Sequence, residues 1–175
     1  MAIKKILTAP DPFLKQISKP VEKVTKDIQQ LMDDMLETMY DAPGIGLAAV
    51  QIGVPLRVIV MDISWRNEDG KKEPLYFVNP EIKVKTKNLS TYEEGCLSVP
   101  DQYAEIDRPE KCEVNYLDYN GKKSTLICEG LLATCIQHEM DHLEGILFID
   151  YLSNLKKNMI VKKLIKLSLI HISEP

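Results

Sequence analysis

Two histidines near residue 140 have the spacing that suits a shared metal ion. The segment His138-Glu139-Met140-Asp141-His142 places two imidazoles four positions apart. On a helix, residues four apart lie one turn above each other on the same face, so both rings can reach one ion, and Glu139 lies beside it. A metal held in this way can activate water for hydrolysis, with the glutamate as general base. The alternative is a pair of solvated histidines on an acidic helix.

A third ligand must be found elsewhere in the chain, because a catalytic site of this kind usually has three protein ligands. The remaining histidine, His171, lies among the last residues, so we expect a carboxylate or a cysteine. The metzincin pattern fails because Phe148 stands where its third histidine belongs. A thermolysin-like site would use a glutamate well downstream, yet Glu174 is the only glutamate after Glu144. Both observations disfavour a zincin endopeptidase.

Cys96 is the candidate for the third ligand. It lies in the segment 93–100, Glu-Glu-Gly-Cys-Leu-Ser-Val-Pro, where Gly95 allows close approach of the backbone. A thiolate is a strong, soft ligand for a transition metal, although a cysteine beside glycine is more often a buried core thiol. The chain has four cysteines: Cys96, Cys112, Cys128 and Cys135. They form no C-x-x-C pair, so we expect thiols rather than a disulfide framework.

The elements that must position these residues follow from periodicity and capping signals. Apolar spacing predicts a helix from Lys26 to Asp41, and a second from Gly130 to Leu143 that carries both histidines and ends at Gly145. Ser153 can cap a third helix. Its expected packing side consists of Leu155, Met159, Ile160, Val161, Leu164 and Ile165.

Strand signals lie between the first two helices. Arg57–Ile63 is an apolar run, and 75–78 and 81–87 are expected as two strands broken at Asn79-Pro80. Alternation on both sides of Asn120-Gly121 predicts a β-hairpin over 111–128. Strands followed by a buried helix in one unit indicate an α+β domain.

Composition limits the class of protein. The 175 residues are 45% apolar and 27% charged, with a net charge of −4. These values are ordinary for a globular domain, and no basic block indicates nucleic-acid binding. We find no apolar run of membrane-spanning length and no secretory signal. The sequence therefore predicts a protein of the bacterial cytoplasm that neither enters a membrane nor carries a nucleic-acid motif.

Three segments in order make the chain resemble a known family. They are residues 44–51 (Gly-Ile-Gly-Leu-Ala-Ala-Val-Gln), 94–98 (Glu-Gly-Cys-Leu-Ser) and 137–142 (Gln-His-Glu-Met-Asp-His). This order closely resembles the signature motifs of the bacterial peptide deformylases, in the compact form typical of Gram-negative bacteria. The resemblance extends to about Lys166 and implies the deformylase fold: antiparallel sheets and a β-hairpin around a central metal-binding helix, with helices near both ends. We expect one domain over 1–167, and a tail over 168–175 that is disordered or not part of the natural chain.

The resemblance implies a metal-dependent hydrolase that removes the formyl group from formylmethionine on nascent chains and releases formate. Cys96, His138 and His142 would hold one divalent ion with water as the fourth ligand. Fe(II) is the family's physiological metal, and zinc, nickel or cobalt can occupy the same site. Glu139 would shuttle the proton, while the Gln51 side chain and the Leu97 backbone N–H stabilise charge on the formyl oxygen.

The family expectation also includes transient contact with the ribosome, and we expect a monomer. A metal-stabilised binding module without catalysis is the alternative from another class of protein. The presence of Glu139 and Gln51 argues against it, since neither residue is required merely to hold a metal.

Substrate-binding residues can be proposed from helical geometry. Cys135, Thr134 and Leu131 precede His138 by three, four and seven positions, so they share its face and can line a pocket for the methionine side chain. Plain core packing is an equal alternative for Leu131. In the first motif, Gly44, Ile45 and Gly46 can offer backbone groups to an extended peptide. Tyr103 stands where some family members have arginine, so the preference for downstream residues can differ.

Overall fold

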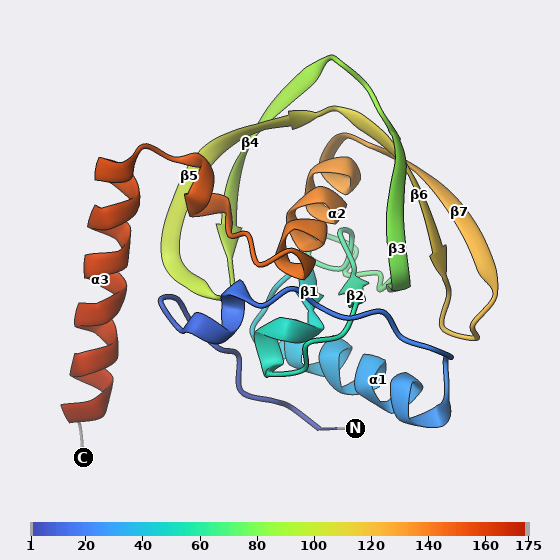
Figure 1. The fold of residues 1–175 in the computed structure, drawn as a ribbon, viewed down its shortest axis with the longest axis horizontal. Helices are drawn as coiled ribbons and strands as arrows, with labels where there is room; N and C mark the ends of the chain where they lie inside the picture. Colours follow the sequence, from blue (N-terminus) through green and yellow to red (C-terminus); the bar gives the residue numbers. More distant parts are fainter. Residues whose placement is uncertain (1, 174–175) are drawn as a thin grey trace.

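The histidine-bearing helix α2 (Gly130–Leu143) lies at the centre of the computed structural model, between two antiparallel β-sheets (Figure 1). The structure describes residues 2–173, and side chains up to residue 169. Within this range the larger sheet has the strand order β1-β2-β3-β6-β7. Its strands are β1 Gly46–Ala48, β2 Val58–Met61, β3 Leu75–Lys85, β6 Lys111–Leu117 and β7 Lys123–Glu129. The smaller sheet pairs β4 Leu89–Cys96 with β5 Val99–Pro109.

Helices cover the outside of this arrangement. Helix α1 (Lys26–Asp41) packs beside β1 and β2, and α3 (Asn154–Ser173) stands at the edge of the molecule next to β5 (Figure 1). Three short 3-10 helices complete the described elements: η1 Pro12–Lys15, η2 Ala49–Ile52 and η3 Phe148–Tyr151. The predicted α+β fold around a central helix is confirmed.

Two apolar clusters hold the central elements in place. Met32, Met35 and Met39 of α1 are fully buried against the sheet, and each such side chain contributes about 1.5–3 kcal/mol relative to an exposed one. On the other side of the sheet, Ile136 and Leu143 of α2 belong to a second buried cluster. The packing of its apolar face therefore fixes the orientation of α2, and with it the direction in which the polar face of this helix points.

The bounds of α1 and α2 agree with the prediction because local signals define them. The Thr25 hydroxyl accepts a hydrogen bond from the Ile28 N–H at 3.4 Å and caps α1. Gly145 has a φ of 73° directly after the C-cap of α2. A side chain there would meet the Lys15 carbonyl oxygen at 2.3 Å, so this turn requires glycine.

The prediction of two strands broken at Asn79-Pro80 is wrong. A single strand, β3, runs from Leu75 to Lys85, with register shifts against β6 on either side of Glu81 and Ile82. Asn79 has a φ of 50°, and its side chain exchanges two hydrogen bonds of 2.7 Å with the backbone of Val21. The turn signal therefore marks a bulge, held by the segment that precedes α1 and contains Val21, rather than a strand end.

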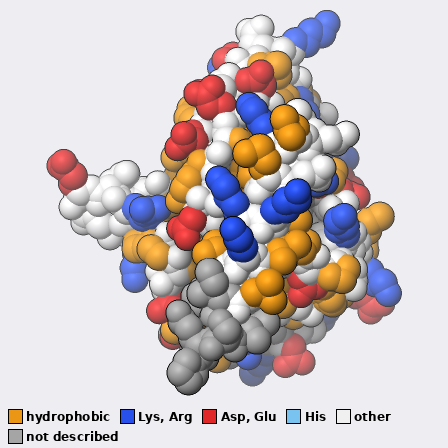
Figure 2. Space-filling view, turned by 90° about the vertical axis from the view of Figure 1, so that its left-hand side faces the viewer, with side chains coloured by type: hydrophobic (Ala, Val, Ile, Leu, Met, Phe, Trp, Pro, Cys, Tyr) orange, Lys and Arg blue, Asp and Glu red, His pale blue; other side chains and the backbone are white. Residues whose placement is uncertain are grey.

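Helix α3 packs along a narrower stripe than the predicted one. Leu164 is buried and Ile160 and Val161 are partly buried, whereas Leu155 and Met159 are 73% and 53% exposed. Ile165 is exposed as well. Figure 2, which faces this side of the molecule, shows lysines and apolar side chains interspersed on the surface.

The C-terminal segment continues α3, so residues 168–173 are helical. The predicted end of the domain at residue 167 stays a prediction, and residues 174–175 lie outside the described part of the chain. No helix among the described residues is long and apolar enough to cross a membrane.

Candidate active site

Three candidate metal ligands converge where α2 passes the end of β4. Cys96 is the last residue of β4, and ligand atoms of Cys96, His138 and His142 all lie within 4.8 Å of one another. The Cys96 Sγ and His142 Nε2 atoms are 3.3 Å apart. Two such ligands on one tetrahedral ion are separated by about 3.5 Å, from metal–sulfur and metal–nitrogen lengths of roughly 2.3 and 2.0 Å. This donor set therefore fits a borderline-soft divalent ion.

Buried charges orient the first histidine. The Glu94 Oε1 atom lies 3.0 Å from His138 Nδ1, which directs the opposite ring nitrogen toward Cys96. Arg108 donates to both oxygens of Glu94, at 2.6 and 2.9 Å, and to Asp141 at 2.8 Å. Metal-binding histidines usually have such a carboxylate partner, because it holds the ring in one tautomer and orientation. Neither Glu94 nor Arg108 was predicted from the sequence as a site residue.

The protonation of the two rings differs. Burial lowers the pKa of His142 well below its ordinary value, with His138 and Arg108 acting in the same direction, so this imidazole is neutral as a metal ligand must be. Burial also acts to lower the pKa of His138, but Cys96 and Glu94 raise it well above its ordinary value. A metal ion bound by His138 would therefore have to displace a proton from this ring.

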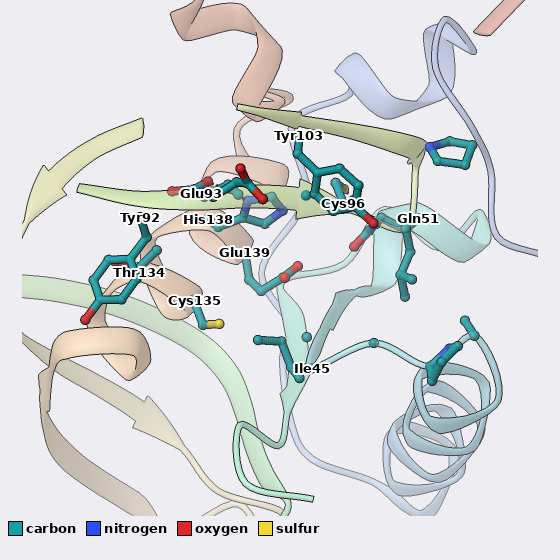
Figure 3. Close-up of a pocket in the computed structure, with 18 of the residues that line it drawn as sticks. Ile45, Gln51, Tyr92, Glu93, Cys96, Tyr103, Thr134, Cys135, His138 and Glu139 are labelled. Carbon is teal, nitrogen blue, oxygen red and sulfur yellow. Dashed lines mark hydrogen bonds and ion pairs between the residues drawn. The ribbon is translucent and has the colours of Figure 1, made fainter. Parts of the chain in front are cut away.

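Glu139 lies beside the three ligand atoms and points into the cavity between the sheets (Figure 3). Its side chain is 5% exposed, and its Oε1 atom is without a hydrogen-bond partner among the described residues. The same atom is 3.9 Å from His142 Nε2. Burial raises the pKa of Glu139 to about 7. A carboxylate with this environment can both take and return a proton near neutral pH.

Gly46 of β1 is the residue that makes room for this carboxylate. A Cβ atom at position 46 would lie 2.6 Å from Glu139 Oε2 and 3.1 Å from its carboxyl carbon. The sequence predicted Gly46 as a residue of close approach to a substrate. The structure shows a further role inside the protein: because Gly46 has no side chain, the Glu139 carboxylate can lie against its backbone.

Gly46→Ala is accordingly expected to lower kcat by about a hundredfold, because a displacement near 1 Å in a reacting group has this effect. For the deformylase activity that the resemblance implies, the measurement is steady-state formate release at saturating peptide. Adding Gly46→Ala to Glu139→Gln should then cost much less than it costs the wild type, since both act through one carboxylate. An equal loss in the double variant would contradict this role.

The Gln51 side chain bridges the first and second motifs. Its Oε1 accepts from the Ala48 N–H at 2.9 Å, and its Nε2 donates to Ser98 Oγ at 2.9 Å. The same Nε2 lies 3.6 Å from Cys96 Sγ. Gln51 is 1% exposed, so this amide is rigidly held next to the ligand cluster. Ser98, which the sequence did not single out, completes its hydrogen bonding.

Leu97 lies between β4 and β5, directly after the cysteine. Its side chain packs on Gly44, where a Cβ atom would lie 2.7 Å from Leu97 Cδ1. Because Gly44 and Gly46 have no Cβ atoms, the side chains of Leu97 and Glu139, respectively, can pack directly against the backbone of this segment.

A cavity of about 490 Å³ joins the predicted residues. In Figure 3, Glu139 lies centrally, with Cys96 and His138 on one side and Thr134 and Cys135 on another. Leu131, Thr134 and Cys135 all line the cavity, so the helical spacing correctly placed them on one face. Leu131 is 39% exposed, which excludes plain core packing. The segment Gly44–Gly46 and Gln51 also line it, whereas His142 is fully buried behind it.

Several lining residues come from parts of the chain that were not predicted to reach the site. They include Tyr92 and Glu93 of β4, Asp101 of β5 and Arg66 of the loop after β2. Tyr103, which the resemblance placed near the rim of the pocket, lines the cavity as well, with its ring against Gly95. No local pattern marks these residues, because their placement depends on how β4, β5 and the loop after β2 pack around α2.

Taken together, a Cys-His-His donor set with two buried histidines, beside an unpaired carboxylate and open to a peptide-sized cavity, defines the site of a metal-dependent hydrolase. The family model described as polypeptide deformylase matches residues 3–158. The chain belongs to this family, and it is an enzyme that removes the N-terminal formyl group from polypeptides.

Individual relatives support the assignment over nearly the whole length. The peptide deformylase of Pelagibacter ubique is 72% identical over 95% of this chain and 96% of its own. The crystal structure of the Ehrlichia chaffeensis peptide deformylase has a TM-score of 0.93 at 40% identity, covering 98% of this chain and 99% of that one. The Legionella pneumophila structure has a TM-score of 0.91 at 48% identity, covering 99% and 100%. Neither the binding-module alternative nor the endopeptidase alternative is favoured.

Proposed function

We propose that Cys96, His138 and His142 hold one divalent ion, Fe(II) in the cell, and that Glu139 is the proton shuttle of the deformylation. The observation that carries this proposal is the buried, unpartnered Glu139 Oε1 next to three ligand atoms. An unpaired buried carboxylate oxygen is costly, so it is expected to have a partner during function. A bound divalent ion supplies Lewis acidity, which makes water nucleophilic near neutral pH.

The residues of the chain then account for the movement of protons. Glu139 takes a proton from the water that adds to the formyl carbon. It gives this proton to the peptide nitrogen as the C–N bond breaks, so that a free amine and formate leave. The Gln51 Nε2 and the Leu97 N–H donate hydrogen bonds to the negatively charged oxygen that forms on the formyl carbon, and each such donor can be worth roughly 3 kcal/mol.

Substrate placement follows from the two sheet edges. β1 is the terminal strand of the larger sheet, and β4 faces it across the cavity. We infer that the peptide lies extended along the segment Gly44–Gly46, as an added strand. The methionine side chain enters the part of the cavity lined by Leu131, Thr134 and Cys135, of which Thr134 and Cys135 are buried and Leu131 is exposed.

The test is a single preparation in which metal content and formate release are both measured. Metal-free protein is reloaded anaerobically with Fe(II), zinc, nickel or cobalt, and formate release from formyl-Met-Ala-Ser is measured for each. We expect turnover that requires metal, with Fe(II) the most active. The acetylated peptide serves as the control for general amide hydrolysis. Metal-loaded protein without formate release would contradict the proposal and favour a binding module.

Three further expectations complete the proposal: a monomer, a cytoplasmic location and transient contact with the ribosome. The lysines on the outer side of α3 support the last of these, since ribosomal RNA is negatively charged. Co-sedimentation of the protein with ribosomes should occur at low salt and be lost at high salt. Binding that is independent of salt would contradict an electrostatic contact.

A further inference from the structure

The loop between β2 and β3 forms one side of the cavity opening and is organised by a buried carboxylate. Asp62 Oδ1 accepts hydrogen bonds from the backbone N–H groups of Ser64 and Trp65 at 3.1 and 3.2 Å. Its Oδ2 accepts from Tyr40 Oη at 2.6 Å and from the Glu73 N–H at 2.8 Å. This carboxylate therefore ties both ends of the loop together and, through Tyr40, to α1, although most of the loop is exposed.

Trp65 attaches this loop to the peptide-binding segment. Its indole N–H donates to the Gly44 carbonyl oxygen at 2.9 Å, and the Asp62 N–H donates to the Ile45 carbonyl oxygen at 2.9 Å. The Trp65 ring packs edge-on against Tyr40, with centroids 5.0 Å apart. The next residue in the chain, Arg66, thus has its backbone fixed next to the segment along which the substrate is proposed to lie.

Arg66 is unusual among the cavity residues in its positive charge. It lines the cavity, and no other lining residue that the structure describes is a lysine or an arginine. It forms no ion pair with a described carboxylate. The exposed lining residues, here called the rim, are Pro43, Arg66, Glu93, Gly95, Asp101, Tyr103 and Leu131.

The rim is the part of the cavity that residues after the methionine must pass. The two histidines, Glu139 and the inner wall of Thr134 and Cys135 are buried, so the formyl group and the methionine side chain occupy the inner part. The remainder of the peptide leaves between β1 and β4, and therefore past Arg66. An unpaired guanidinium offers a planar pair of donors that matches a carboxylate.

We propose that Arg66 is a specificity-determining residue that favours substrates with an acidic side chain at one of the two positions after formylmethionine. This inference rests on the proposed function, because it assumes the peptide path along Gly44–Gly46. Arg66 acts through binding of the extended substrate, and the bond cleavage itself does not depend on it.

The experiment compares matched peptides that differ only in charge: formyl-Met-Asp-Ala-Ser with its Asn form, and formyl-Met-Ala-Asp-Ser with its Asn form. For the wild-type enzyme we expect kcat/KM to be about threefold higher for Asp than for Asn at the contacted position, which is the scale of an exposed ion pair. The difference should lie in KM and shrink at 0.5 M salt. Arg66→Ala should bring the ratio to one, and Arg66→Glu should invert it.

Lys71→Ala is the matched control. Lys71 belongs to the same loop and pairs with Glu73, but it does not line the cavity, so its removal changes net charge equally and should leave the Asp/Asn ratio as in the wild type. A ratio of one for both wild-type pairs, or a ratio that persists in Arg66→Ala, would overturn the inference. Faster turnover of peptides with Lys in place of Asp would also overturn it, because the carboxylates of Glu93 and Asp101 would then determine the charge preference of the rim. Hydrolysis of the Asn peptides tests the proposed function separately.

Discussion

Glu139→Ala is expected to reduce formate release from a formyl-Met peptide on the order of a thousandfold while the protein keeps its metal. Removal of a general acid–base group typically costs a hundred- to ten-thousandfold in rate. Glu139 is the one carboxylate whose unpaired oxygen, within the described part of the chain, faces the ligand cluster. Glu139→Gln should behave in the same way, because an amide of the same shape cannot accept and return the proton.

Two further measurements separate this role from a structural one. Metal content should stay at one ion per chain in both variants, since the ligand atoms belong to Cys96, His138 and His142. The melting temperature should be unchanged or higher, because either variant removes a buried carboxylate that has an unpaired oxygen. Turnover close to that of the wild type in either variant would exclude Glu139 as the proton shuttle.

Cys96→Ala is expected to lose metal and, with it, nearly all activity. Removing even a supporting partner of a ligand typically costs ten- to a hundredfold in metal affinity, so the loss of one of three ligands should exceed about a hundredfold. The measurement is the metal-to-protein ratio after dialysis against graded chelator concentrations. The loss of the thiolate also alters which metals the site prefers, because the two remaining imidazoles are harder ligands than a thiolate.

Cys112→Ala provides the control for this second prediction. Cys112 lies on β6, is 3% exposed and belongs to the apolar core rather than to the ligand cluster. Its replacement should lower stability slightly through the lost packing and leave metal binding intact. Equal metal retention by the two variants would mean that Cys96 is not the third ligand.

Helices were the most predictable part of the fold. The bounds of α1 and α2 depend on signals that lie within a few residues: the Thr25 cap, the apolar spacing and Gly145. The hairpin β4–β5 was missed because polar residues such as Glu94 and Arg108 occupy buried positions in it, so the apolar–polar alternation that marks a half-buried strand is weak in the sequence. The prediction divided β3 in two because the turn preference of Asn79-Pro80 can be recognised locally. The hydrogen bonds between the Asn79 side chain and the backbone of Val21 join distant residues, so the local sequence does not reveal them.

The sequence by itself determined the helical pair His138 and His142, the adjacent Glu139 and the face shared with Thr134 and Cys135, because a helix converts spacing directly into geometry. Only the tertiary structure decided which cysteine meets the two rings. The approach of Cys96 depends on the packing of two sheets around α2, and no spacing rule reaches across 42 residues of chain.

The same limit applies to the groups that support the site. Arg108 and Glu94 orient His138 across separate elements, Gly46 admits Glu139, and Trp65 holds Arg66 at the rim. The contacts of His138 with Glu94, of Glu139 with Gly46 and of Trp65 with Gly44 join residues that are more than 20 positions apart, so they depend on the packing of separate elements. Local periodicity thus specifies the reacting face of α2, and long-range packing specifies what that face meets.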